Sequence, residues 1–208
     1  MHGTHVAVQD GLLKRILWLY GLYTIPANAS FLIGFYLLPE GVLRSTPTGA
    51  VARVAAAPHG FWGQFTLTLL INLSWGFILT AVLNLNRIRG IPAGYLIPMV
   101  AGIISGLVLG TDSFAADDLS KYKNVRAALA LGLTIGGLEM LAYVMVAAAT
   151  VRLGIYEYES WWRWGGPYKP IKLMRFSEIR LAGSELACVA VALLLLIIAA
   201  WRETAMVR

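Results

Sequence analysis

Glu139 is an acidic residue near the middle of an apolar stretch long enough to cross a bilayer, residues 127–154. A charged acid at the centre of a membrane helix costs roughly 2.5–3.5 kcal/mol on insertion scales for Asp, so such residues are rarely idle. Glu139 could carry protons, bind a cation or pair with a basic group of a partner. Alternatively, it could be protonated and hydrogen-bonded to Asn72, Thr134 or Tyr143, which would fix helix register. We favour this structural or assembly role, because no second charge is evident within the membrane segments.

The other chemistry-bearing residues give weaker signals. The three histidines, His2, His5 and His59, lie outside the apolar runs, which disfavours haem held between two membrane helices. Three loop acids lack the spacing of an EF-hand: Asp112, Asp117 and Asp118. No GxxxxGK[ST], GxSxG, HExxH or CxxC motif is present. We therefore expect no catalytic residue, no metal site and no cofactor.

The composition places the chain in a membrane. Its residues are 58% hydrophobic and 13% charged, with a mean hydropathy of +0.68, which is too apolar for a soluble core of 208 residues. The apolar residues fall in runs of about 20, the length that crosses the hydrocarbon. We predict a single all-α, multi-pass domain over residues 1–208 in the cell membrane, with five transmembrane helices at about 12–38, 62–85, 91–110, 127–153 and 177–201.

The net charge of +6 comes from basic residues scattered along the loops, which favours anionic lipid headgroups as partners and not nucleic acid. Under the positive-inside rule, ten of the seventeen Lys and Arg fall on the inner side if the N-terminus is cytoplasmic. We therefore expect a cytoplasmic N-terminus. Cys188 is the single cysteine, so no disulfide can form within the chain.

Proline and polar residues predict the connections between these helices. We expect the first helix to be retained and kinked at Pro26, although residues 27–29 also resemble a signal-peptidase site. Residues 86–90 should form a tight turn, and Pro92 suits the first turn of the following helix. Ser177 is the expected N-cap of the last helix. We also expect a short helix at 48–57 and a solvated connection at 111–124.

Small residues at helical spacing predict where helices approach closely. The third segment carries a small-residue ridge at four-residue spacing: Gly94, Pro98, Gly102, Gly106 and Gly110. The fourth segment carries a second ridge: Ala128, Gly132 and Gly136. Such ridges let two backbones come together in the manner of GxxxG contacts. We predict that these two ridges pack against each other.

The loop at 155–176 is unusually rich in aromatic residues, among them Trp161, Trp162 and Trp164. Tryptophan and tyrosine rings are typical of the headgroup level of a bilayer. The same rings could form a docking surface for another subunit. We favour the interfacial anchor and keep the docking surface as the alternative.

Parts of the chain resemble the stage II sporulation protein M family of membrane proteins. The fourth segment is similar to its G-x-x-E-x-x-A...L-G signature: Gly136, Glu139, Ala142 and the ending 148–154. Asn72 and the apolar tail with a Glu at 199–203 also lie where that family has such residues. Ile135 stands where the family commonly has a His, so no His–Glu pair is present. The resemblance, which spans most of the chain from Trp62, implies a membrane assembly protein; in spore formers such proteins anchor peptidoglycan-degrading partners during engulfment.

These features lead to two functional hypotheses. The first is a non-enzymatic membrane scaffold or accessory subunit that packs with other membrane proteins or with its own copies. Its partner-binding candidates are Glu139, Asn72, Tyr143, Trp161, Trp162 and Trp164. The second is a small transporter or proton-coupled permease that uses Glu139 and Asn72. A membrane enzyme acting on lipid ranks third, because no nucleophile or base can be named.

Overall fold

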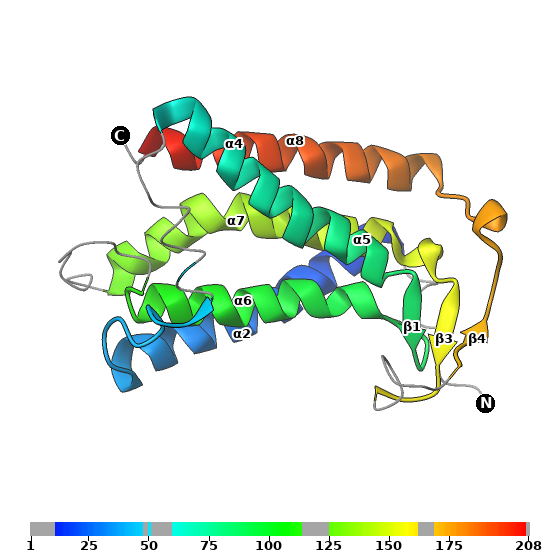
Figure 1. Ribbon diagram of the computed structural model, residues 1–208, viewed down its shortest axis with the longest axis horizontal. Helices are drawn as coiled ribbons and strands as arrows, with labels where there is room; N and C mark the ends of the chain where they lie inside the picture. The colour runs from blue at the N-terminus through cyan, green and yellow to red at the C-terminus, as the bar shows by residue number, and fades with distance from the viewer. Residues whose placement is uncertain (1–10, 48–49, 51–59, 114–124, 162–168, 207–208) are drawn as a thin grey trace.

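The computed structural model describes residues 11–47, 50, 60–113, 125–161 and 169–206, and for 125–135 and 206 it describes the backbone alone. The described residues form a bundle of five long helices, which confirms the predicted all-α architecture (Figure 1). The second helix consists of three consecutive pieces with a π-helical middle, Leu73–Ile78. The helices are α2 (Leu12–Leu37), α4 (Gly60–Asn72) continuing into α5 (Leu79–Leu83), α6 (Leu96–Gly110), α7 (Val125–Ala149) and α8 (Gly183–Met206).

The helices have the length and surface of membrane-spanning segments. Four of those described are long and apolar enough to cross a bilayer: Leu12–Leu37, Gly60–Leu83, Ala93–Gly110 and Gly183–Ala205. Large apolar side chains remain exposed on the outside of the bundle, for example Trp18 (61%), Ile25 (73%) and Trp75 (67%). So many large exposed apolar side chains are rare in soluble proteins, and such a surface is one that lipid covers. The chain is therefore a multi-pass membrane protein.

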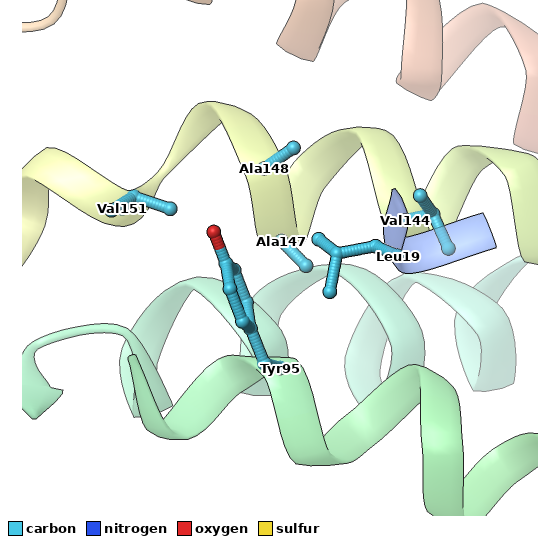
Figure 2. Close-up of a cluster of buried hydrophobic side chains, with 6 residues drawn as sticks. All are labelled: Leu19, Tyr95, Val144, Ala147, Ala148 and Val151. Carbon is cyan, nitrogen blue, oxygen red and sulfur yellow. The ribbon is translucent and has the colours of Figure 1, made fainter. Parts of the chain in front are cut away.

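The helix α7 forms the centre of the bundle, between the pair α4 and α8 and the pair α2 and α6 (Figure 1). Its residues 142–149 are all buried apart from Met145. Figure 2 shows Tyr95 reaching from the beginning of the third helix toward Ala147 and Val151, with Leu19 of α2 beside it. The small side chain of Ala147 leaves room for the ring of Tyr95. A second cluster joins α7 to α8: Met140, Ala142, Tyr143, Val146, Ala192 and Leu196.

The glycines of α6 pack against α2. A Cβ atom placed on Gly106 would lie 2.3 Å from the backbone oxygen of Ala27, a distance that real Cβ contacts essentially never show. A Cβ on Gly102 would lie 2.5 Å from the ring of Tyr23. These two helices share the most extensive contact in the described bundle. The backbones touch there because glycine has no side chain to hold them apart.

The prediction that the ridge of the third segment meets the fourth segment is therefore wrong. Near the end of the ridge, a Cβ on Gly110 would lie 2.4 Å from the backbone oxygen of Phe31, and Gly34 of α2 faces Gly110 in return. By contrast, a Cβ on Gly136 of α7 would meet no described atom within 4 Å. Gly132 lies in α7, but its surroundings fall outside the described residues.

A small sheet caps one end of the bundle (Figure 1). Its strands follow the order β2-β1-β3-β4: β1 (Asn86–Ile88), β2 (Ile91–Pro92), β3 (Tyr156–Tyr158) and β4 (Ile171–Lys172). The predicted tight turn is the β1–β2 hairpin, in which Arg89 (φ 52°) and Gly90 (φ 78°) both have positive φ. This backbone matches the twist of an antiparallel pair. Strand β3 of the aromatic loop then pairs in parallel with β1.

Several predicted helix ends differ from the structure. Pro92 lies in β2 and precedes a 3₁₀ turn, Ala93–Tyr95, so it is not in a first helical turn. Ser177 belongs to another short 3₁₀ turn, and α8 begins only at Gly183. The α-helical part of the fourth segment ends at Ala149, before a 3₁₀ turn. Most of the short helix expected at 48–57 lies outside the described residues. Proline and serine favour helix starts only locally. Pro92 instead pairs with Arg87 in the sheet, so the third helix begins after it.

Proline 26 lies inside α2, which continues from Leu12 to Leu37. Two polar side chains next to it donate hydrogen bonds to the backbone one turn earlier: the Thr24 hydroxyl to the Tyr20 carbonyl (2.7 Å) and the Asn28 amide to the Thr24 carbonyl (2.9 Å). These bonds satisfy polar side chains within the helix itself. The kink that we expect at this proline stays a prediction.

We expect Gly106→Ala to destabilise the protein by about 1–3 kcal/mol, because the new methyl group would force α2 and α6 apart at a backbone contact. The matched control is Gly21→Ala in α2, where a Cβ would meet nothing within 4 Å. That change should stabilise the helix by up to about 1 kcal/mol. Heating the detergent-solubilised protein with a thiol-reactive dye reports unfolding through Cys188, which is buried and has no disulfide partner. Equal shifts of the unfolding temperature in Gly106→Ala and Gly21→Ala would contradict the backbone contact between α2 and α6.

Candidate functional site

Glu139 meets Asn72 inside the bundle. The side-chain amide of Asn72 donates a short hydrogen bond to Oε1 of Glu139, and both side chains are partly buried. Asn72 was one of the three hydrogen-bond partners expected for this acid. Oε2 of Glu139 accepts no hydrogen bond from the described residues. Among the described residues, the acid is therefore held through one of its two oxygens.

The π-helical stretch Leu73–Ile78 shapes this site. Asn72 immediately precedes it, and Gly76 within it faces the ring of Tyr143, where a Cβ would lie 1.7 Å from a ring carbon. Tyr143 is one helical turn after Glu139 on α7, and only 5% of it is exposed. Single turns of π-helix occur often at functional sites, because the extra residue redirects the side chains beside it. Here the stretch brings an amide and a glycine to the same face of α7.

Two further groups interact electrostatically with Glu139: the carboxyl of Glu203 in α8 and the phenol of Tyr23 in α2. Both also interact with Tyr143. Glu203 was expected in a tail beyond the last membrane helix, but α8 continues to Met206 and includes it. The expectation that the membrane segments hold no second charge is therefore wrong, because the membrane-length helix Gly183–Ala205 includes Glu203. A Glu shortly after an apolar run was the available signal in the sequence.

Open space lies beside the same part of α7. Cβ atoms on Gly136 and Gly137 would meet no described atom within 4 Å. These glycines precede Glu139 by three and two residues, so Gly136 shares its face of the helix. A helix surface without side chains is a place where another helix can approach closely.

Trp161, the tryptophan candidate that the structure describes, is separate from Glu139. Trp161 is 40% exposed and follows β3, whereas Trp162 and Trp164 lie outside the described residues. The opposite end of the bundle carries a second aromatic group from α4 and α8, with ring centroids 4.8–6.2 Å apart: Phe61, Trp62, Phe65 and Trp201. Exposed rings at the two ends of a bundle match the aromatic belts of membrane proteins.

A buried ion pair joins α2 to the start of α8. Arg15 is 7% exposed and Glu185 is 1% exposed, and Nη2 of Arg15 lies 3.4 Å from Oε1 of Glu185. The half-exposed Arg152 approaches the same oxygen to 3.2 Å. Arg15 also donates a hydrogen bond to the carbonyl of Ala148 (2.8 Å). Glu185 was expected only as an acid in the first turns of the last helix, and nothing local in the sequence indicates its pairing with Arg15, 170 residues away.

Arg87 anchors the sheet to the end of α7. Its guanidinium donates a hydrogen bond to the carbonyl of Val151 (3.1 Å) and lies where a side chain on Gly154 would have to be. Burial lowers the pKa of Arg87 from its ordinary value, and Glu157, its pairing partner on β3, opposes that change.

At the opposite end, Asp112 is buried instead of solvated as expected. It is 4% exposed and has a φ of 50°, a left-handed conformation that Asp and Asn tolerate. Arg44 donates a hydrogen bond to its backbone carbonyl (3.4 Å). Burial, together with the charge of Glu40, raises the pKa of Asp112, and Arg44 partly offsets this. The other two loop acids, Asp117 and Asp118, lie outside the described residues.

We expect Asp112→Asn to remove a pH-dependent loss of stability. The raised pKa means that the folded state keeps this proton to a higher pH than the unfolded chain, whose Asp ionises near 3.8. Stability therefore falls as the pH rises from that value through the folded pKa, and it is restored at lower pH. Asn cannot ionise, yet it tolerates the positive φ. The melting temperature of the variant should exceed that of the parent at about pH 7, and the gap should close toward about pH 4. A gap that is constant with pH would contradict the assignment.

No family model matches the chain, and neither the curated proteins nor the solved structures give a significant match.

Proposed function

We propose that this protein is a non-enzymatic membrane scaffold or accessory subunit whose α7 binds another membrane helix. The observation that supports this most is an acid with one unused oxygen next to two glycines. Among the described residues, Oε2 of Glu139 accepts no hydrogen bond, and no atom would lie within 4 Å of a Cβ on Gly136 or Gly137. A partner helix could come close there and donate a hydrogen bond to Glu139. The resemblance to sporulation protein M supports the same class of assembly protein.

The proposal is tested by placing a large side chain on the glycine surface of α7. Gly136→Leu should abolish co-purification of a partner membrane protein or a second copy from native membranes in mild detergent, because the side chain occupies the space of the incoming helix. Gly21→Leu is the matched control, since a Cβ on Gly21 also meets nothing within 4 Å. Glu139→Gln, which keeps an acceptor oxygen, should weaken the complex less than Glu139→Leu. A lone, monodisperse monomer from the unmodified protein would overturn the proposal.

A proton-coupled permease is the second candidate, and Glu203 is the observation that favours it. Two acids and two tyrosines from α2, α7 and α8 interact electrostatically within one part of the bundle: Glu139, Glu203, Tyr23 and Tyr143. Chains of titratable groups in a membrane are typical of proton relays. Flux in reconstituted vesicles distinguishes the candidates: a permease loses proton-driven flux in Glu139→Gln, whereas a scaffold shows equal flux in parent and variant.

The proposed orientation places the sheet end in the cytoplasm. Basic residues of α2, the hairpin, the end of α7 and β4 gather at that end of the bundle: Lys14, Arg15, Arg87, Arg89, Arg152 and Lys172. The positive-inside rule assigns the end richer in Lys and Arg to the cytoplasm. Protease or thiol-label accessibility of residues in the hairpin, measured in sealed vesicles of known orientation, tests this arrangement of the cell-membrane protein.

A further inference from the structure

Residues 169–180, which we term the strap, cross the end of the bundle before the chain enters α8. The strap contains β4 and the 3₁₀ turn Phe176–Glu178. In Figure 1 the chain between β4 and α8 runs across the ends of the helices. Because α8 is a membrane-length helix that begins at Gly183, the strap lies close to the level where the bilayer begins. A segment at this depth and in this direction runs parallel to the membrane surface.

The exposed side chains of the strap are of two kinds. Three are large and apolar: Ile171 (56% exposed), Leu173 (40%) and Phe176 (61%). Four are basic and exposed: Lys169, Lys172, Arg175 and Arg180. Glu178 is the acidic residue of this segment, and one of its oxygens accepts the backbone N–H of Arg175 (2.8 Å). Four basic residues and one acidic residue leave a net charge of +3 over the strap.

We propose that the strap binds the anionic lipid surface of one leaflet, with its basic side chains on headgroup phosphates and its apolar side chains inserted between the lipids. The mixture of side chains indicates a lipid surface, because apolar and cationic residues alternate along the strap. A bilayer interface offers anionic headgroups and an apolar interior next to each other. Trp161, also exposed, adds a ring suited to the same level. This inference goes beyond partner binding at α7, because it uses other residues at the end of the bundle.

A single fluorescent label can be placed on the strap, because Cys188 is the single cysteine of the chain and can be removed. In a Cys188→Ser background, Phe176→Cys carries an environment-sensitive fluorophore, and the protein is reconstituted in nanodiscs of phosphatidylcholine with or without phosphatidylglycerol. Quenching by acrylamide, which is uncharged, reports how exposed the label is. We expect the anionic lipid to shift emission to the blue and to protect the label, and high salt to reverse both effects. A label at Leu173→Cys repeats the measurement at a second position.

Charge variants decide between lipid binding and other causes of protection. Lys172→Gln and Arg175→Gln should each lower the ratio of bound to detached strap about five-fold, because a basic residue near an anionic surface contributes about that factor. Arg202→Gln, near the far end of α8, is the control and should change nothing. Equal quenching in both lipids, or protection that the Gln variants leave intact, would overturn the proposal and indicate that protein covers the strap.

Discussion

Replacing Glu185 with alanine is expected to cost about 3–5 kcal/mol of stability, the range measured when one partner of a buried ion pair is removed. Arg15 would then remain as a buried cation, since it is 7% exposed and, among the described residues, would keep only its hydrogen bond to the carbonyl of Ala148. The change also removes the carboxylate oxygen that accepts the N–H of Ala182 (2.8 Å) at the start of α8. Thermal unfolding in detergent, followed by helical circular dichroism, measures the loss.

Two controls separate charge from packing in this pair. Arg152→Ala should cost at most about 1 kcal/mol, because Arg152 is 52% exposed and water replaces its contact. The double variant Arg15→Met with Glu185→Leu should recover much of the stability lost in Glu185→Ala, because no unpaired charge stays buried. If Arg152→Ala and Glu185→Ala cost the same, the burial of Arg15 is not the cause.

The membrane helices were predictable because the thickness of a bilayer sets their length. The first span was predicted at 12–38 and observed at Leu12–Leu37, and the second at 62–85 and observed at Gly60–Leu83. The four-stranded sheet was not predictable in this way. Its strands have two or three residues, which is too short for an alternating pattern to stand out.

Which helices pack against each other was also not predictable from the sequence. The ridge on α6 was visible in the sequence, and a small-residue face that could receive it was visible in the first segment as well: Ala27, Ser30 and Gly34. Their spacing of three and four residues puts them on one side of a helix. Composition alone does not rank this face against the ridge of the fourth segment. Shape complementarity along the whole contact decides, and that depends on side chains far from the ridge.

The candidate site was predictable in part. An intramembrane acid and an intramembrane amide identified Glu139 and Asn72, because polar groups in a bilayer need partners. Glu203 was missed because its charge, together with that of Arg202, indicated the end of the membrane helix. The π-helical stretch was missed as well, since its apolar residues continue the same run. Tertiary packing produces both features, and no local pattern encodes them.

Asn84→Leu is expected to destabilise the protein by at least about 3 kcal/mol, because Asn84 is fully buried and holds three elements together. Its amide nitrogen donates to the carbonyl of Ala147 (2.9 Å) and to the hydroxyl of Thr150 (2.6 Å) at the end of α7. Its Oδ1 accepts the backbone N–H of Gly94 (3.0 Å) in the turn before α6. Leucine has a similar volume but satisfies none of these groups, and the buried N–H of Gly94 would lose its bond.

Two further variants show which bonds matter at Asn84. Thr150→Val removes one acceptor and leaves the Ala147 carbonyl and the Gly94 N–H paired, so it should cost only about 1 kcal/mol. Asn84→Asp keeps an acceptor for Gly94 but places carboxylate oxygens against the Ala147 carbonyl, so its penalty should grow as the pH rises and the acid ionises. A pH-independent penalty equal to that of leucine would show that the amide donor to α7 carries the whole effect. Because α7 is the helix that also holds Glu139, loss of this contact should weaken partner binding at α7 even under conditions in which the bundle stays folded.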